Sequence, residues 1–348
     1  MQDLAQRSIG GRSRKTNAAL LLILFLATAV VFCLNIAMGA VQIDLLDILR
    51  ILVSDVNEEL TDSLIILRIR LPRALATIGG GMALAISGLL LQAFFNNPIV
   101  EPYVLGISSG SSLFMALVTL GGFTFGITRI TPMFIFTGAF IGAMLVMMVV
   151  IIASRHVKSM VTLLVIGMMA GYICSAGTSV MTVFAEKEKI AGYVIWSMGS
   201  FSGFTWQQAG ILFAIVLPFS VLAFCMSKPL NTLLMGDRYA ESMGVRIRLI
   251  RRAIILISSV LTAAVTSFAG PVSFIGLAVP HICRVIFKTA DNRVLLPAAA
   301  VTGALMTGLC DLIARNIIAP VELPLAAITS AIGAPIVVYL LTRGDKDR

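Results

Sequence analysis

The chain has 348 residues, of which 58% are apolar and only 12% are charged, and its mean hydropathy is +0.99. A soluble domain needs about twice that share of charge to cover its surface, so the composition excludes an ordinary soluble protein. The formal net charge of +9 says nothing about partners until the basic residues are placed along the chain.

Membrane spans are located by uncharged runs, because a charge at mid-membrane costs several kcal/mol. The first run is too long for a cleaved signal segment and is expected to be a retained helix. Gly270-Pro271 divides the run 253–283, because proline cannot continue a helix. Without that break the count is nine; with it, ten spans are predicted at 16–43, 74–100, 102–128, 130–154, 159–185, 207–227, 253–270, 273–287, 294–310 and 323–342. A short helix that does not span is expected before 207.

The placement of lysine and arginine favours ten spans over nine. With ten, both termini share one side, which holds 18 of the 26 basic residues. The positive-inside rule then puts both termini in the cytoplasm. The net charge is therefore a topology signal, and no nucleic-acid partner is expected. We predict a single all-α permease domain over 1–348, with cytoplasmic tails at 1–15 and 343–348 and a cytoplasmic loop at 228–252.

Enzyme and metal motifs find little support. The five cysteines form no CxxC pair and are expected to be small buried hydrophobes; they are Cys33, Cys174, Cys225, Cys283 and Cys310. The G-x-S-x-G match at 106–110 begins an apolar segment and is interpreted as an irregular helix start. No P-loop motif occurs in the sequence, so ATP, if it drives transport, must be hydrolysed on another subunit.

Helix packing is predicted from glycine pairs spaced four residues apart. Such pairs let helix backbones approach closely in membranes. They occur at 138/142, 167/171 and 199/203.

The cytoplasmic loop contains a predicted short helix, with Asp237 as its N-cap and Gly244 just past its end. Apolar residues precede it. Such a helix could insert into a partner's groove. The same pattern is equally expected of an amphipathic loop that lies on lipid headgroups.

Basic residues on the opposite side break the positive-inside bias. Arg68, Arg70 and Arg73 precede the second span, and Arg315 follows Asp311 by four residues, which allows a local pair. Docking of an acidic extracytoplasmic partner explains these arginines; anchoring in headgroups is the alternative.

An ordered set of motifs carries a family resemblance. The set consists of Arg70-Leu-Pro-Arg73, Ser87-Gly-Leu-Leu-Leu-Gln92, Asn97-Pro-Ile-Val-Glu-Pro102, Leu105-Gly-Ile-Ser-Ser-Gly110, Leu234-Met-Gly236 with Gly244, Ala269-Gly-Pro271, Phe274-Ile-Gly-Leu277, Pro280-His281, Arg284, Glu322-Leu-Pro324 and Gly333-Ala-Pro335. From about residue 64 to 342 the chain resembles the FecCD family of ABC-importer permeases for iron-siderophore, heme and vitamin B12.

The resemblance implies the type II ABC importer permease fold, in the bacterial plasma membrane and in contact with lipid. The implied partners are a second permease copy (identical or a sister chain), two cytoplasmic ATPase subunits that hold ATP and Mg²⁺, and an extracytoplasmic substrate-binding protein. This chain itself is expected to bind no cofactor or metal and to be no enzyme. The spans around 160–184, 273–287 and 324–342 are expected to line a largely apolar pathway.

The resemblance also assigns residues. Arg70, Arg73 and Arg315 are expected to dock the binding protein, and Asn97 with His156, Val157, Lys158 and Ser159 is expected to form the cytoplasmic gate. The helix seated on the ATPase is expected to involve Leu234, Met235, Gly236, Asp237, Arg238, Ala240, Glu241 and Gly244.

The cargo stays open between a ferric siderophore, which is favoured, and heme or cobalamin. A secondary transporter driven by an ion gradient is a distant alternative. It needs acidic residues inside the bundle, and Glu101, Asp311 and Glu322 are the candidates.

Overall fold

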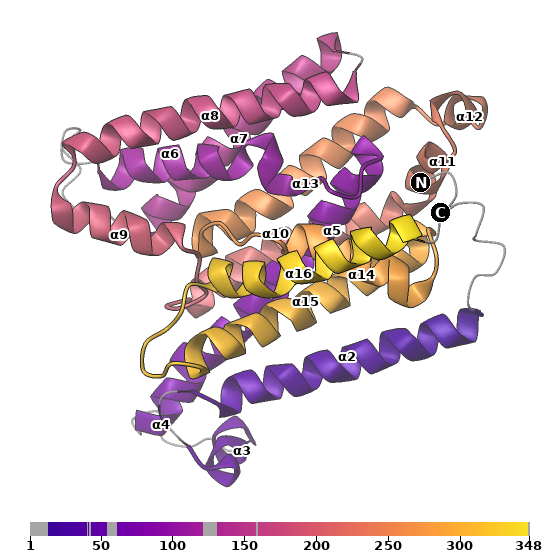
Figure 1. Cartoon of the computed structure of the whole chain (residues 1–348). Coiled ribbons are helices and arrows are strands. Elements are labelled where there is room, and N and C mark those ends of the chain that lie inside the picture. Colours follow the sequence, from indigo (N-terminus) through magenta and orange to yellow (C-terminus); the bar gives the residue numbers. More distant parts are fainter. Residues whose placement is uncertain are drawn as a thin grey trace.

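The computed structural model describes residues 13–346, apart from residues 40, 42, 54–60, 121–130 and 158. In this part of the chain every regular element is a helix (Figure 1). The elements are α2 (Arg14–Ala37), α3 (Leu45–Val53), α4 (Thr61–Leu64), the π-helical turn η2 (Ile65–Arg70), α5 (Leu71–Phe95), the 3₁₀ turn η3 (Pro102–Leu105), α6 (Ile107–Thr119), α7 (Pro132–His156), α8 (Met160–Phe184), α9 (Lys187–Ser197), α10 (Trp206–Cys225), α11 (Ser227–Leu234), α12 (Asp237–Ser242), α13 (Ile247–Ala269), α14 (Ile275–Phe287), α15 (Asn292–Asn316) and α16 (Leu325–Lys346).

Seven of the described helical segments are long and apolar enough to cross a membrane, and α6, α14 and the first part of α16 are shorter apolar helices. Together these segments fall on the ten predicted spans in the same order. The all-helical membrane fold is therefore confirmed. The number of true crossings stays a prediction.

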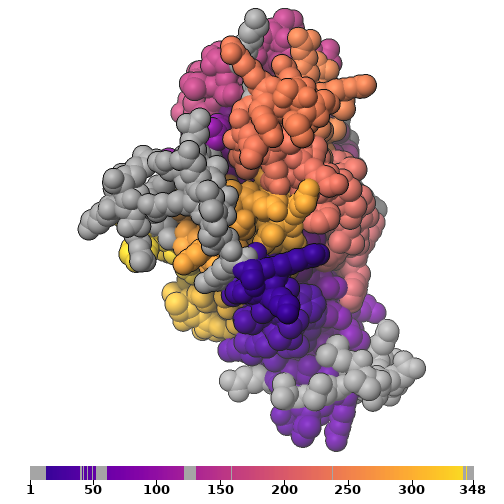
Figure 2. All heavy atoms as spheres, turned by 90° about the vertical axis from the view of Figure 1, so that its right-hand side faces the viewer, coloured from indigo at the N-terminus to yellow at the C-terminus, as the bar shows by residue number. Residues whose placement is uncertain are grey.

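The two ends of the bundle differ (Figure 1). The start of α2, the end of α16, α11 and α12 all lie toward the right-hand side of the picture, called here the α12 end, while α3 and α4 lie at the lower left, called the α3 end. Seen from the α12 end, coral and orange atoms form the upper part of the surface and the indigo start of α2 lies below them on the same face (Figure 2). This arrangement agrees with an even number of crossings. Which end faces the cytoplasm stays a prediction.

The helix α5 forms the centre of the bundle. In the most apolar 18-residue stretch of the segment Thr61–Phe95, 83% of the residues are buried. In the corresponding stretch of α8 only 17% are buried. Its small residues make this position possible, because a Cβ atom at Gly88 would lie 1.9 Å from the carbonyl oxygen of Gly276 in α14. The peripheral helix α8 instead leaves much of its apolar surface uncovered by the described chain.

Two predicted interruptions are confirmed. The helix α13 ends at Ala269, Gly270 adopts a positive φ of +72°, and α14 begins only at Ile275. The carboxylate of Glu101 supports this break by accepting the amide of Phe274 at 2.6 Å. The short helix expected before the sixth span is α9.

Of the three glycine pairs, two bring helices together and one does not. A Cβ atom at Gly142 would lie 2.3 Å from the carbonyl oxygen of Gly110, and one at Gly167 would lie 3.0 Å from the Cα atom of Leu105. The pair Gly199 and Gly203 lies in the turn between α9 and α10, where both have positive φ. The prediction of a helix contact there was wrong, because these glycines serve a turn.

Two further expectations need correction. Cys283 and Cys310 are buried as expected, but Cys33 and Cys225 lie on the exposed surface of their apolar helices. The helix α3 was not predicted, because charged residues such as Asp47 and Arg50 interrupt its apolar pattern. Its apolar face nevertheless packs on α2 and η2 through Ile48 and related residues.

Candidate functional site

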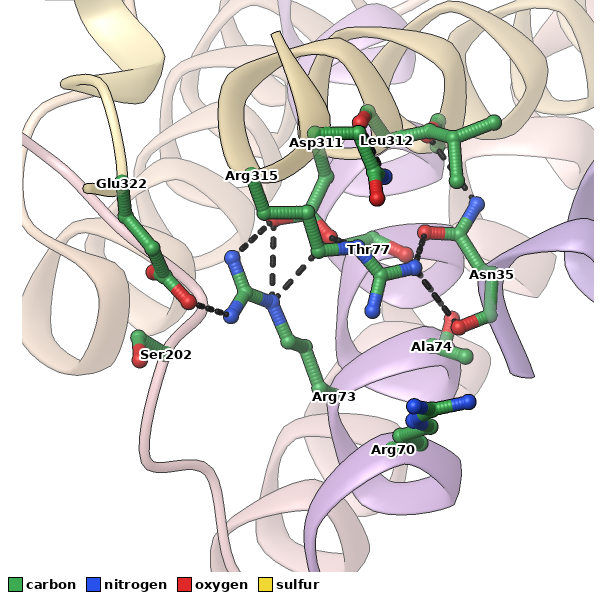
Figure 3. Close-up of polar contacts among 12 residues, drawn as sticks. Asn35, Arg70, Arg73, Ala74, Thr77, Ser202, Asp311, Leu312, Arg315 and Glu322 are labelled. Atoms are coloured by element: carbon green, nitrogen blue, oxygen red, sulfur yellow. Dashed lines mark hydrogen bonds and ion pairs between the residues drawn. The ribbon is translucent and has the colours of Figure 1, made fainter. Parts of the chain in front are cut away.

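The three arginines predicted to dock a partner lie together at the α3 end (Figure 3). They come from the junction of η2 with α5 and from the last turn of α15, and with Asp311 and Glu322 they form what we call the arginine cluster. Arg70, Arg73 and Arg315 are 4%, 6% and 7% exposed. Guanidinium groups this deeply buried require polar partners.

Arg70 closes the end of the first helix. Its Nη1 donates to the carbonyl oxygens of Ile36 and Ala37, at 2.8 and 2.7 Å, and its Nη2 donates to the carbonyl of Val41. Ile36 and Ala37 are the last residues of α2, whose carbonyls have no partner within the helix. A cation at this position also complements the helix dipole. Arg70 therefore fixes α2 against α5.

Arg73 holds two carboxylates at once. Its Nε and Nη2 donate to Asp311 at 2.9–3.2 Å, and its Nη1 donates to Oε1 of Glu322 at 2.7 Å. Two-point pairing of this kind is among the strongest side-chain interactions. It ties α5 to α15 and to the turn that leads into α16.

Arg315 reaches back to α2. Its Nη2 donates to the backbone and side-chain oxygens of Asn35, at 2.6 and 2.7 Å. The predicted pair with Asp311 is present, but its closest approach is 3.8 Å. Among the described atoms the buried Nε of Arg315 has no hydrogen-bond partner. Arg315 thus makes two hydrogen bonds, fewer than either Arg70 or Arg73.

Glu322 forms the accessible rim of the arginine cluster. Its side chain is 40% exposed, while that of Asp311 is 1% exposed. Burial would raise the pKa of Glu322, but the hydrogen bond and charge of Arg73 outweigh burial and lower it. The five side chains of the arginine cluster carry three positive and two negative charges. An incoming carboxylate would therefore meet a net positive site whose outermost ligand is an internal carboxylate.

The short helix predicted in the cytoplasmic loop is present at the α12 end, and its role in coupling stays a prediction. α12 spans Asp237–Ser242, and its N-cap is Gly236 at φ +106°, so the prediction of Asp237 as N-cap was wrong by one residue. Gly244 follows the helix at φ +79°, as predicted. Ala240 is buried, whereas Met235, Tyr239 and Met243 are 69%, 46% and 61% exposed. Met235 precedes α12, Tyr239 lies within it and Met243 is its C-cap, so all three exposed side chains belong to this short helix or its ends. Arg238 and Glu241 are also exposed, and Leu234, which ends α11, is half-buried.

The side chain of Asn231 ties α11 and α12, together called here the coupling segment, to the start of α15. The Nδ2 atom of Asn231 donates to Asp291 at 2.6 Å, and its Oδ1 accepts from the backbone and side chain of Asn292, both at 2.8 Å. Asn292 begins α15, whose other end carries Asp311 and Arg315. One helix thus connects the coupling segment to the arginine cluster.

The residues predicted to gate the pathway occupy two turns. Asn97 is exposed and its Oδ1 accepts the amide of Ile99 at 3.0 Å. His156 ends α7, Val157 is its C-cap, and Ser159 caps α8 by accepting the amide of Thr162 at 3.3 Å. Lys158 lies outside the described residues. The gate stays a prediction.

Sequence reasoning found the arginines and the pair of Arg315 with Asp311, but it missed the contacts of Arg73 with Asp311 and Glu322. Asp311 and Glu322 were the available signal, since acidic residues are rare in this part of the chain and so are natural counter-charges. The acceptor Asn35 gave no signal, because it stands in a different apolar segment. No group of three or more His, Cys, Asp or Glu suited to a metal ion occurs within the described ranges.

A helical bundle with a buried charge cluster at one end and an exposed short helix at the other defines a multi-pass membrane permease. The sequence model of the FecCD transport family matches residues 24–343, and the chain belongs to that family. The match begins at residue 24, whereas the motifs that carry the resemblance begin only at about residue 64. The family is one of transport permeases of the inner membrane, not of catalytic enzymes.

Named relatives agree with this assignment. The chain is 34% identical over 284 residues to the hemin transport system permease protein HmuU of Yersinia pestis, covering 81% of this chain and 84% of that one. It is 35% identical over 289 residues to the vitamin B12 import system permease protein BtuC of Salmonella typhi, covering 81% and 85%.

Solved structures support the same fold. A metal-chelate type ABC transporter in an inward-facing conformation superposes with a TM-score of 0.83 at 28% identity, covering 94% of this chain and 99% of that one. PsaBC from Streptococcus pneumoniae, at 15% identity and a TM-score of 0.53 over 78% of this chain and 90% of that one, shares the fold only.

Proposed function

We propose that the chain is the membrane permease of a binding-protein-dependent ABC importer that carries a metal chelate, with a ferric siderophore as the favoured cargo. The observation that carries this proposal is the placement of the arginine cluster and the exposed helix α12 at opposite ends of one FecCD bundle. The names of HmuU and BtuC support heme or cobalamin as the second candidate. Two ATPase subunits, an extracytoplasmic binding protein and a second permease copy complete the importer.

The mechanism follows from the helix connections. A loaded binding protein docks over the arginine cluster, and ATP-driven closure of the ATPase subunits pushes α12. The asparagine contact between α11 and α15 carries this movement into the bundle, since α15 also holds Asp311 and Arg315. The bundle then alternates its opening. ATP is hydrolysed on the partner subunit, because this sequence has no P-loop.

Docking at this site is a carboxylate exchange. Arg73 is already paired with Glu322, which is the exposed member of the cluster. A carboxylate of the binding protein gains its place on Arg73 by displacing Glu322. The deeper Asp311 stays in place and keeps α5 joined to α15.

Two substitutions of the arginine cluster are expected to change docking in opposite directions. Glu322→Gln removes the competing charge and should tighten binding-protein affinity about threefold to tenfold, a range typical of one partly exposed charge. Arg315→Gln removes one positive charge and should weaken it by a similar factor. Affinity is measured by calorimetry on the detergent-solubilised importer at low and high salt, with Arg50→Gln as an exposed control. Equal effects of both substitutions would refute docking by charge exchange.

The cargo is tested on the cognate binding protein by calorimetry with ferric siderophores, hemin and cyanocobalamin. We expect a ferric siderophore to be retained most tightly. Retention of hemin or cyanocobalamin alone would replace the favoured cargo and leave the permease assignment in place.

A further inference from the structure

A pocket lined only by hydroxyl residues lies between α6, α8 and α9. Its volume is about 320 Å³ and each of its eight lining residues carries a hydroxyl group. We call it the hydroxyl pocket; its lining includes Ser109 and Ser112 of α6, Ser175, Thr178 and Ser179 of α8, and Tyr193 of α9. Such a concentration of hydroxyls is unexpected in a pathway predicted to be largely apolar.

The pocket is built by close contact between α6 and α8. Gly106, at the start of α6, has a φ of +76°, and a Cβ atom there would lie 2.7 Å from the carbonyl oxygen of Gly167 in α8. This approach brings Ser175 Oγ to 3.3 Å from Ser109 Oγ across the two helices. The two glycines therefore place hydroxyls from segments far apart in sequence around one space.

The hydroxyl protons on α8 are already used inside the protein. Thr178 donates to the carbonyl of Cys174 and Ser179 to that of Ser175, both at 3.0 Å, and Ser175 donates to Ser109. A hydroxyl oxygen that donates keeps lone pairs for accepting. Because no charged side chain lines the pocket, it presents neutral hydroxyl groups, and those of α8 are left to act as hydrogen-bond acceptors.

The pocket opens on the peripheral side of the bundle. Ser175 and Ser179 are exposed on α8. Only 17% of the most apolar stretch of that helix is buried. Figure 1 shows α8 and α9 at the outer edge of the molecule. The segment 160–184 is also one of those expected to line the pathway. A ligand in transit along that face would pass the mouth of the pocket.

We propose that the hydroxyl pocket accepts hydrogen bonds from N–H and O–H groups on the rim of the cargo during translocation. It takes a chelate edged with amides or hydroxyls and disfavours one edged with carboxylates. A carboxylate would find no cation there, and the α8 hydroxyls could donate to it only by giving up their internal bonds. This inference rests on the proposed function as a chelate permease.

Several weak hydrogen bonds suit passage better than one strong bond. Each neutral bond contributes little net free energy against water, so the cargo is oriented without being trapped. The cavity is large enough for one edge of a chelate and small for a whole one. The bulk of the cargo would remain in the pathway.

The test uses the complete importer with its binding protein in proteoliposomes, supplied with cyanocobalamin, a ferric hydroxamate bearing free amide N–H groups, or hemin. For the donor-bearing chelate that is imported, Ser109→Ala/Ser175→Ala/Ser179→Ala should lower the initial uptake rate about tenfold, since three weak bonds are lost. ATPase activity and docking should be retained. Thr137→Ala, which removes an exposed hydroxyl bonded within α7, is the matched control and should leave uptake unchanged.

A chemical arm separates hydrogen bonding from general damage. Methylating the N–H groups of the imported chelate should slow the wild-type importer and leave the triple variant no slower. Wild-type uptake by the triple variant, or import of hemin alone, would overturn the hydroxyl pocket while leaving the permease function intact. Absence of ATP-dependent uptake for every probe would overturn the proposed function and this inference with it.

Discussion

The substitution Ala240→Pro is expected to lower the rate of chelate uptake by the importer at least about tenfold, while the permease remains folded. The amide of Ala240 donates to the carbonyl of Gly236 at 3.0 Å, and α12 has only six residues. Proline removes that bond and clashes with the preceding turn, at a cost of about 3 kcal/mol in a helix interior. So short a helix has no further turn to absorb the change, and the exposed side chains of Tyr239 and Met243 are displaced.

Uptake and ATP hydrolysis are measured together in proteoliposomes. The Ala240→Pro importer should either hydrolyse ATP without uptake or release its ATPase subunits. Ala240→Ser keeps the amide and nearly the same volume at this buried position, so it serves as the control and should stay coupled. A fully coupled proline variant would refute the role of α12.

Replacing Asp311 by alanine is expected to destabilise the permease by about 3–5 kcal/mol, as removal of one partner from a buried ion pair does. Asp311 is 1% exposed, and its Oδ1 accepts a hydrogen bond from Nη2 of Arg73 at 2.9 Å. Its Oδ2 lies 3.8 Å from Nε of Arg315. Without it two guanidinium groups face each other in a buried space, with Glu322 as the remaining carboxylate of the cluster.

Thermal unfolding of the purified permease in detergent measures this effect. Asp47→Ala breaks the exposed pair with Arg50, where both side chains are more than half exposed. That control should change stability by less than about 1 kcal/mol. Equal unfolding temperatures for the two variants would contradict the account of the arginine cluster as a structural joint between α5 and α15.

Much of the fold was predictable because the membrane imposes simple constraints. Uncharged runs located the spans, and Gly270-Pro271 correctly divided one run into α13 and α14. The short helix after Gly236 was predictable from Asp237 and Gly244, although Gly236 and not Asp237 is its N-cap. These features depend on local chain chemistry, which a single sequence contains.

Features that depend on contacts between distant segments were not predictable. The pairing of Arg315 with Asn35 joins residues far apart in the chain, and neither position indicates the other. The hydroxyl pocket likewise gathers serines and threonines from α6 and α8 that read singly as packing residues. The pair Gly199 and Gly203 was misassigned, because the same spacing serves a turn as well as a helix contact.

The most direct test of the central claim is ATP-dependent uptake by the reconstituted importer. The permease, its ATPase and its binding protein are placed in proteoliposomes, and internalised chelate is measured with ATP, without ATP and with a protonophore. We predict that uptake of a metal chelate requires both ATP and the binding protein and is unaffected by the protonophore. Uptake that proceeds without ATP and is abolished by the protonophore would contradict the account and indicate an ion-coupled carrier.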